Sequence, residues 1–175
     1  QTCALPISSE VGCANGDSIA TTDNTVAWIG TSKAYGRSVY LMDGTSPIRV
    51  STSSIDRFLE KSDLSKVSSY FYKFHGHMLY VLTLHDLNIT LVLDVIEKQW
   101  YQWTQYAIAS EDQDNPGEWI ESYFRPIYYA EANQTPYCLD CDRGLLYYLS
   151  PEQYSDDGAP IYCRSVTDIA DNQST

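Results

Sequence analysis

The stretch that decides the fold lies between residues 70 and 103, and it holds four short runs rich in apolar and aromatic residues: YFYKF at 70–74, HGHMLYVLTLH at 75–85, TLVLD at 90–94 and QWYQW at 99–103. Residues 78–84 are apolar at nearly every position, which is typical of a strand covered on both faces. The polar residues between the runs fall where hairpin turns belong. Four short antiparallel strands of this kind predict one blade of a β-propeller.

A module of similar design precedes this stretch and another follows it. The three modules occupy residues 10–62, 63–110 and 119–167. The strand ends at Asp43, Asp94 and Ser150 lie 51 and 56 residues apart, slightly more than the ~40–50 residues typical of propeller blades. We therefore predict an all-β chain, a partial β-propeller of about three four-stranded antiparallel meander blades.

One short helix is expected to link the first two blades, within residues 53–61. Ile55, Phe58 and Leu59 share one face when this segment is helical. Ser53 followed by Asp56 resembles a capping box in which an acid replaces the usual Glu or Gln.

Three segments fall outside the predicted blades. Residues 1–9 resemble the translation of a sequencing adapter, and we expect them to be a non-native leader. The first methionine is Met42, so we expect the chain to be a piece of a longer protein. Residues 111–118 form an acidic loop with a turn at Asn-Pro-Gly, and residues 168–175 form a polar tail.

Charge and composition exclude several classes of protein. The net charge is -12, and the residues from Glu111 onward hold 3 basic and 13 acidic residues, so they alone carry -10. Such a surface repels phosphate and anionic lipid, which argues against charge-driven binding of nucleic acid or membrane. No apolar run approaches the roughly 20 residues of a membrane span. Five cysteines are too few and too scattered for a disulfide framework, which favours a reducing compartment.

The histidines are weak candidates for a metal site. His75 and His77, at positions i and i+2, share a face if both lie on a strand, and His85 ends the same apolar run. A metal needs a third convergent ligand, and only Asp86 is near in sequence. The alternative is that these histidines are solvated or hydrogen-bonded, and we expect neither metal nor cofactor.

Cysteines and carboxylates offer two further candidate sites. Cys138 and Cys141 form a CxxC without the second pair that a zinc ribbon needs, so packed thiols are favoured. Asp94, Asp140 and Asp142 are candidates for the paired carboxylates of a glycosidase. All three lie at predicted strand ends or turns, where aspartate is common for hydrogen-bonding reasons. The sequence therefore predicts no catalytic residues and no enzyme.

Aromatic side chains are the main candidates for a structural role. Trp100, Tyr101 and Trp103 are able to stack on sugars or bases, but packing within and between blades is the favoured interpretation. The residues expected to hold the blades together are Trp28, Tyr80, Trp100, Tyr101, Trp103 and Tyr148.

Several of these motifs, in this order, resemble one protein family, the packaged-DNA stabilisation proteins of short-tailed bacteriophages. The resemblance covers roughly residues 11–164, and it departs from the family at Cys138–Cys141 and in the acidic loop. The motifs that carry it are PIRVST at 47–52, Ile55-Asp56, HGH at 75–77, YVLT at 80–83, TLVLD at 90–94, Gln99-Trp100 and GLLYYL at 144–149.

The resemblance implies a virion structural protein that is assembled in the bacterial cytoplasm. Family members form a propeller-containing ring below the portal and adaptor, extend the tail and help to retain packaged DNA, so the expected partners are portal, adaptor, and tail-needle or tailspike proteins. The protein would contact packaged DNA at most non-specifically, in the lumen of the ring, and we expect this lumen to be acidic. Two alternatives remain open: a kelch-like propeller that binds another protein, and a carbohydrate-active propeller enzyme.

Overall fold

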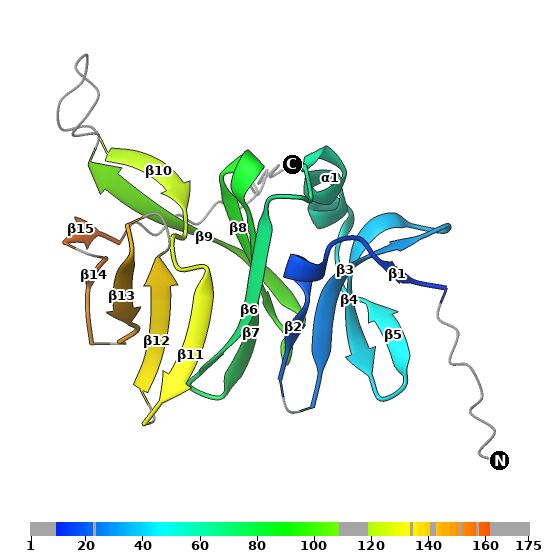
Figure 1. The fold of residues 1–175 in the computed structure, drawn as a ribbon, viewed down its shortest axis with the longest axis horizontal. Coiled ribbons are helices and arrows are strands. Elements are labelled where there is room, and N and C mark those ends of the chain that lie inside the picture. The colour runs from blue at the N-terminus through cyan, green and yellow to red at the C-terminus, as the bar shows by residue number, and fades with distance from the viewer. Residues whose placement is uncertain are drawn as a thin grey trace, which may run out of the picture.

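Three antiparallel sheets stand side by side in the computed structural model, in the manner of propeller blades (Figure 1). The structure describes residues 10–22, 24–108, 119–133, 135–140, 143–150, 152–156 and 158–161. Within these residues the chain is almost entirely β, with one α-helix. The predicted partial β-propeller is therefore confirmed. No helix in these ranges combines the length and the apolar character that crossing a membrane requires.

The first sheet has the strand order β1-β3-β4-β5, and β2 joins the same edge of β3 as β1. Together β1 and β2 act as one outer strand, interrupted by the 3-10 turn η1 (Gly16–Ser18). The strands are β1 (Gly12–Cys13), β2 (Ala20–Thr21), β3 (Val26–Ser32), β4 (Gly36–Asp43) and β5 (Ser46–Arg49).

Helix α1 (Ser53–Lys61) follows β5, as the sequence predicts, but its cap differs from the predicted one. Thr52 has an extended backbone, and its hydroxyl accepts a hydrogen bond from the amide of Ile55 at 3.4 Å. Asp56 forms an ion pair with Arg49 of β5. The predicted capping box is therefore wrong, because a long-range partner holds the acid that would have completed it.

The second sheet has five strands in the order β10-β9-β8-β7-β6. The short turn η2 (His85–Leu87) connects β7 to β8. The sequence groups Trp119–Tyr123 with the third module, but this strand, β10, pairs with β9. The local sequence gives no signal for the sheet that such a strand joins. The strands are β6 (Val67–Phe74), β7 (His77–Leu84), β8 (Ile89–Asp94), β9 (Gln99–Ile108) and β10 (Trp119–Tyr123).

Among the described residues the third sheet has three strands, in the order β11-β12-β13, and most of the fourth predicted strand, residues 160–164, lies outside them. A separate two-stranded hairpin follows the sheet. The strands of the sheet are β11 (Tyr128–Ala132), β12 (Thr135–Asp140) and β13 (Leu145–Tyr148), and those of the hairpin are β14 (Ser155–Asp156) and β15 (Ala159–Pro160).

The repeat is visible in the backbone of the hairpins. The connection between the second and third strands of each sheet ends on a residue in the left-handed conformation: Gly36 (φ 66°), Asn88 (φ 55°) and Gly144 (φ 66°). These residues lie 52 and 56 positions apart, close to the spacing of the predicted strand ends. Glycine and asparagine are the residues that adopt this conformation most readily. Turn chemistry thus marks the repeat.

Candidate functional site

The two faces of the second sheet pack against different neighbours. Side chains alternate along each strand, so successive residues point to opposite faces. One face, which includes Tyr80 and Leu82, joins the first sheet and α1 in the larger apolar core. The other face, which includes Tyr70 and Tyr72, joins the third sheet through Tyr129 and Leu149. The central sheet is therefore covered on both sides, as its apolar runs predict.

Hydrogen bonds join the first and second sheets, one inside this core and others at its margin. The buried hydroxyl of Tyr80 donates to the carbonyl of Ser18 at 2.7 Å, and Ser69 Oγ donates to the carbonyl of Asp17 at 3.0 Å. Burial raises the pKa of the Tyr80 hydroxyl well above its ordinary value of 10, so the hydroxyl keeps its proton and remains a donor. At the outer rim, the indole Nε1 of Trp100 donates to the carbonyl of Val50 at 3.0 Å.

Aromatic rings join the second and third sheets. The ring of Tyr129 stacks on Tyr70, with centroids 6.2 Å apart, and meets Tyr72 edge-on at 5.4 Å. Cys138 is buried beside these rings. Burial raises the pKa of Tyr72 to about 12 and that of the Cys138 thiol to about 12. The thiol therefore stays protonated at neutral pH, which favours packing over redox or metal chemistry; Cys141 lies outside the described residues.

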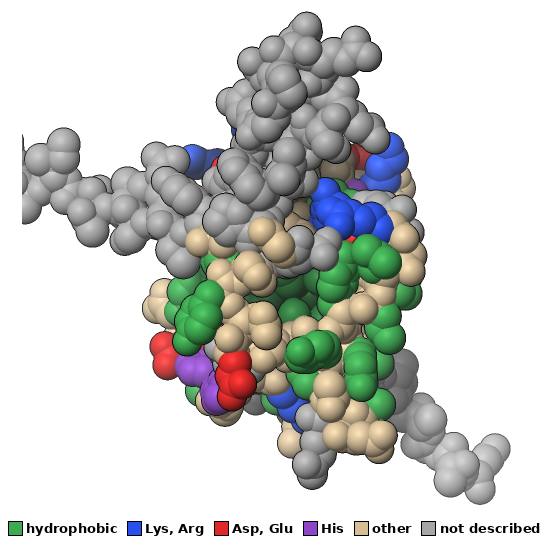
Figure 2. All heavy atoms as spheres, turned by 90° about the vertical axis from the view of Figure 1, so that its left-hand side faces the viewer, with side chains coloured by type: hydrophobic (Ala, Val, Ile, Leu, Met, Phe, Trp, Pro, Cys, Tyr) green, Lys and Arg blue, Asp and Glu red, His purple; other side chains and the backbone are tan. Residues whose placement is uncertain are grey.

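The opposite face of the third sheet is uncovered among the described residues. Tyr128 is 58% exposed, Leu146 65% and Tyr148 59%. Tyr128 and Leu146 both lie opposite Leu139 in the strand register, so the three side chains share this face. Figure 2 looks at this side of the molecule, where hydrophobic side chains gather around a hollow.

The hairpin register shows what this face corresponds to in the second sheet. Tyr70 lies five residues before His75, a turn residue with φ 46°, and Tyr128 lies five residues before Asn133, with φ 52°. Tyr128 is thus the counterpart of Tyr70. In the second sheet, the face that carries Tyr70 is covered by the third sheet. In the third sheet, the corresponding face, which carries Tyr128, is uncovered among the described residues. We call this face, formed by Tyr128, Ala130, Tyr137, Leu139, Leu146 and Tyr148, the stacking face.

The three histidines do not converge on one point. His77 begins β7 and His85 follows its last residue, so the length of the strand separates them. His85 Nε2 lies 3.0 Å from the hydroxyl of Ser68, while Asp86 accepts hydrogen bonds from Ser62 Oγ and the amide of Asp63. The described residues hold no group of three side chains arranged to bind a metal.

His77 instead pairs with Asp94, which closes the turn from β8 to β9. His77 Nδ1 lies 2.5 Å from Asp94 Oδ2, and the amides of Ile96 and Glu97 donate to Oδ1 at 2.9 and 3.1 Å. Burial disfavours ionisation of Asp94, but these hydrogen bonds outweigh it and hold the pKa of the carboxyl below its ordinary 3.8. These hydrogen bonds hold the turn between β8 and β9 against the start of β7.

The candidate carboxylates lie apart. Asp94 pairs with Leu79 near the start of β7, whereas Asp140 ends β12, at the other end of its sheet (Figure 1). Asp140 accepts a hydrogen bond from the amide of Arg143 at 3.2 Å, and the guanidinium of Arg143 lies 4.0 Å away. Asp142 lies outside the described residues. Asp94 and Asp140 therefore serve two separate turns and do not form the pair that a glycosidase needs.

The predicted aromatic residues fall into two groups. Tyr80 and Trp100 lie where the first two sheets meet, and Trp103 packs against Tyr72 and Phe124 with centroids 6.4 and 5.2 Å away. Three residues are less enclosed: Trp28 stacks on Tyr40 at the far side of the first sheet, and Tyr101 and Tyr148 are exposed.

Sequence reasoning missed the tyrosines that join the second and third sheets. Tyr70 and Tyr72 alternate with Phe71, a spacing that places both on one face of a strand. This alternation indicates that Tyr70 and Tyr72 lie together on one face of the sheet. The pairing with Tyr129 depends on how the sheets stack, which is not encoded in the spacing.

Comparison with known proteins agrees with this architecture. No curated protein matches the chain. A protein-family model described as "Bacteriophage P22 Gp10, beta-propeller" matches residues 7–154. This match spans most of the chain and includes all three sheets, so the protein belongs to the bacteriophage P22 Gp10 β-propeller family of phage structural, DNA-stabilising proteins.

Proposed function

We propose that this chain is a tail component of the virion that closes the portal and stabilises the packaged DNA. The observation that carries the proposal is the stacking face, because an aromatic sheet face of this kind is buried at the equivalent place in the second sheet. Exposed apolar patches of this kind mark sites of assembly. Family membership supplies the phage setting in which that assembly occurs.

In this proposal the protein forms a homo-oligomeric ring that contacts portal and adaptor, with tail-needle or tailspike proteins as further neighbours. The blade units would be residues 10–62, 63–110 and 119–167, with β10 reaching back to the second sheet. Stacked sheets suit a load-bearing ring, since each is held face to face by its neighbours.

An acidic lumen is the second part of the proposal. The residues from Glu111 onward carry a charge of -10. Because basic side chains hold duplex DNA through its phosphates, an acidic wall would let packaged DNA pass without binding it. A map of the surface potential of the assembled ring tests this, and a basic lumen would refute it.

A charge placed on the stacking face tests the assembly role. In the phage that encodes this chain, Leu146→Lys should leave DNA packaging intact but lower the DNA retained in heads, measured as nuclease-resistant DNA per capsid. Ile96→Lys is the matched control, because Ile96 is equally exposed but lies in the β8–β9 turn. Heads that retain DNA normally with Lys at position 146 would contradict the proposal.

A further inference from the structure

The three sheets follow one another in a row, and the first and third sheets lie at its two ends (Figure 1). A row of three sheets has two inner junctions and two outer faces. One outer face is the stacking face of the third sheet. The other is the far face of the first sheet, which we call the leading face. It is formed by Val26, Trp28, Tyr40, Met42 and Pro47.

The leading face is apolar and only partly enclosed. Trp28 stacks on Tyr40, with ring centroids 6.0 Å apart. Tyr40 is buried, whereas Val26, Trp28 and Met42 keep part of their surface exposed. None of these residues belongs to the core between the first and second sheets. Within the described residues, the leading face therefore has no sheet stacked on it.

The inner junctions show which face of a sheet meets the sheet that follows it. In each sheet, one residue of the second strand lies seven positions before the left-handed residue that marks the repeat: Ile29, Val81 and Tyr137. Ile29 lies in the junction with the second sheet, and Val81 lies in the junction with the third. Tyr137 is their counterpart on the stacking face. The stacking face is therefore the face that the repeat turns toward a following sheet.

The residues six positions before the same markers identify the opposite face. They are Gly30, Leu82 and Cys138. Leu82 packs toward the first sheet, and Cys138 is buried on the side of the third sheet that meets the second. Gly30 lies on the leading face, beside the ring of Tyr40. The leading face is therefore the face that the repeat turns toward a preceding sheet.

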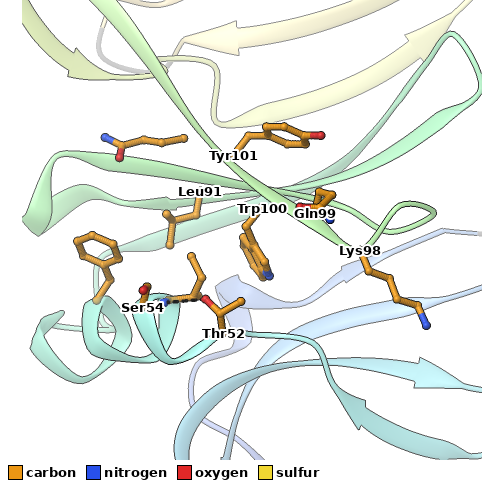
Figure 3. Close-up of a pocket in the computed structure, with 10 residues that line it drawn as sticks. Thr52, Ser54, Leu91, Lys98, Gln99, Trp100 and Tyr101 are labelled. Carbon is orange, nitrogen blue, oxygen red and sulfur yellow. Dashed lines mark hydrogen bonds between the residues drawn. The ribbon is translucent and has the colours of Figure 1, made fainter. Parts of the chain in front are cut away.

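The junction between the first two sheets shows what covers such a face. Leu91 and Trp100 point from the second sheet toward α1 of the preceding module (Figure 3), and Leu82 and Leu91 lie in the shared apolar core. A groove of about 380 Å³ stays open at the rim, lined mainly by residues of α1 and β9. Apolar side chains of one module thus cover the sheet of the next, and the stacking face lacks this cover in the described part of the chain.

We propose that two copies of this chain cover each other's outer faces, with the stacking face of one copy on the leading face of the other. A two-fold axis makes the two contacts equivalent, and the six sheets form one closed ring. Six sheets fall within the roughly four to eight of a β-propeller, whereas three from one copy or nine from three copies fall outside this range. The inference rests on the assembly role proposed for the stacking face and names its partner, a second copy.

Sedimentation velocity of the 175-residue chain measures this association. At about 20 µM the chain should sediment as a dimer of about 40 kDa, twice the 19.8 kDa of one copy. A chain that is still monomeric at about 200 µM overturns the proposal. Assemblies that keep growing with concentration also overturn it, because a contact between unlike faces that does not close produces open filaments.

Charged variants identify the faces that meet. Leu146→Lys on the stacking face and Trp28→Glu on the leading face should each weaken dimerisation about 100-fold, because each places a charge in both equivalent contacts. An equimolar mixture of the two variants should dimerise within about tenfold of the parent chain, since one contact is then unaltered and the other holds charges of opposite sign. Ile96→Lys and Tyr101→Glu are matched controls at exposed positions outside both faces and should dimerise normally.

The proposal is overturned if Leu146→Lys abolishes the dimer and Trp28→Glu does not, because two stacking faces would then meet each other. It is also overturned if the mixture stays monomeric. Should Trp28→Glu fail to fold, judged by circular dichroism, Met42→Glu replaces it. The DNA-retention assay separates this inference from the proposed function: a monomeric chain whose phage loses DNA with Leu146→Lys keeps the assembly role and removes the second copy as partner.

Discussion

The hydroxyl of Tyr80 is a single polar group inside the junction of the first two sheets. Tyr80→Phe would leave the carbonyl of Ser18 buried without this donor. We expect a loss of about 1–2 kcal/mol in the free energy of unfolding, measured by urea denaturation. Tyr101→Phe is the matched control, because Tyr101 is 48% exposed and should change stability little. Equal stability of the two variants would contradict the role of this hydrogen bond.

Asp94 is the second residue whose hydrogen bonds predict an effect on stability, in this case one that depends on pH. Its folded-state pKa is depressed, so it contributes stability above its unfolded pKa and loses it as the pH falls through the folded value. At pH 7, Asp94→Asn should cost about 1 kcal/mol. The difference from the parent chain should shrink as the pH falls below about 4. Urea denaturation from pH 7 to 2.5 measures both, and a constant difference would argue against the assignment.

At the scale of elements, the approach of β1 to β3 depends on the absence of a side chain at Gly30. A Cβ there would lie 2.5 Å from Val11 Cγ1 and 2.7 Å from Tyr40 Cδ2. Gly30→Ala should therefore destabilise the chain by about 1–3 kcal/mol. Gly12→Ala in the neighbouring strand is the control, since a Cβ at Gly12 meets nothing within 4 Å. Thermal unfolding of the two variants distinguishes them, and a neutral Gly30→Ala would show that β1 can shift.

The elements also show where local sequence is sufficient. The strands around the apolar runs and the helix after β5 follow from hydrophobic period and turn residues. The cap at Thr52 does not, because Thr52 and Ser53 offer the same chemistry and Arg49 holds Asp56. The local sequence also does not show which sheet β10 joins, because a short strand pairs with whichever strand edge the folded chain presents.

At the scale of the molecule, stability is shared between neighbouring sheets. Tyr129 is the main aromatic contact from the third sheet to the second. Tyr129→Ala should cost about 3 kcal/mol and should raise hydrogen exchange in β11–β13 more than in β7 and β8. Tyr128→Ala, on the stacking face, is the control and should leave exchange in the isolated chain unchanged. Uniform exchange changes across all sheets would indicate a single cooperative unit.

The candidate site was only partly accessible from the sequence. Aromatic residues were expected to join the blades, and Tyr80 and Trp100 do lie at a junction of sheets. Tyr70, Tyr72 and Tyr129 were missed, and Tyr148 lies on an uncovered face. The reason is that a period of two assigns a residue to a face of its strand but does not say which sheet, if any, covers that face.

The sequence alone determined the class of fold, the repeat of about fifty residues and the family, because these depend on local period, turn chemistry and the order of motifs. Only the tertiary structure decided which aromatic faces are buried and that β10 pairs with β9 of the second sheet, in line with β8, rather than with the third sheet. The physical reason is that strand pairing and sheet stacking join residues far apart in the chain, and many such pairings are compatible with one pattern of hydrophobicity.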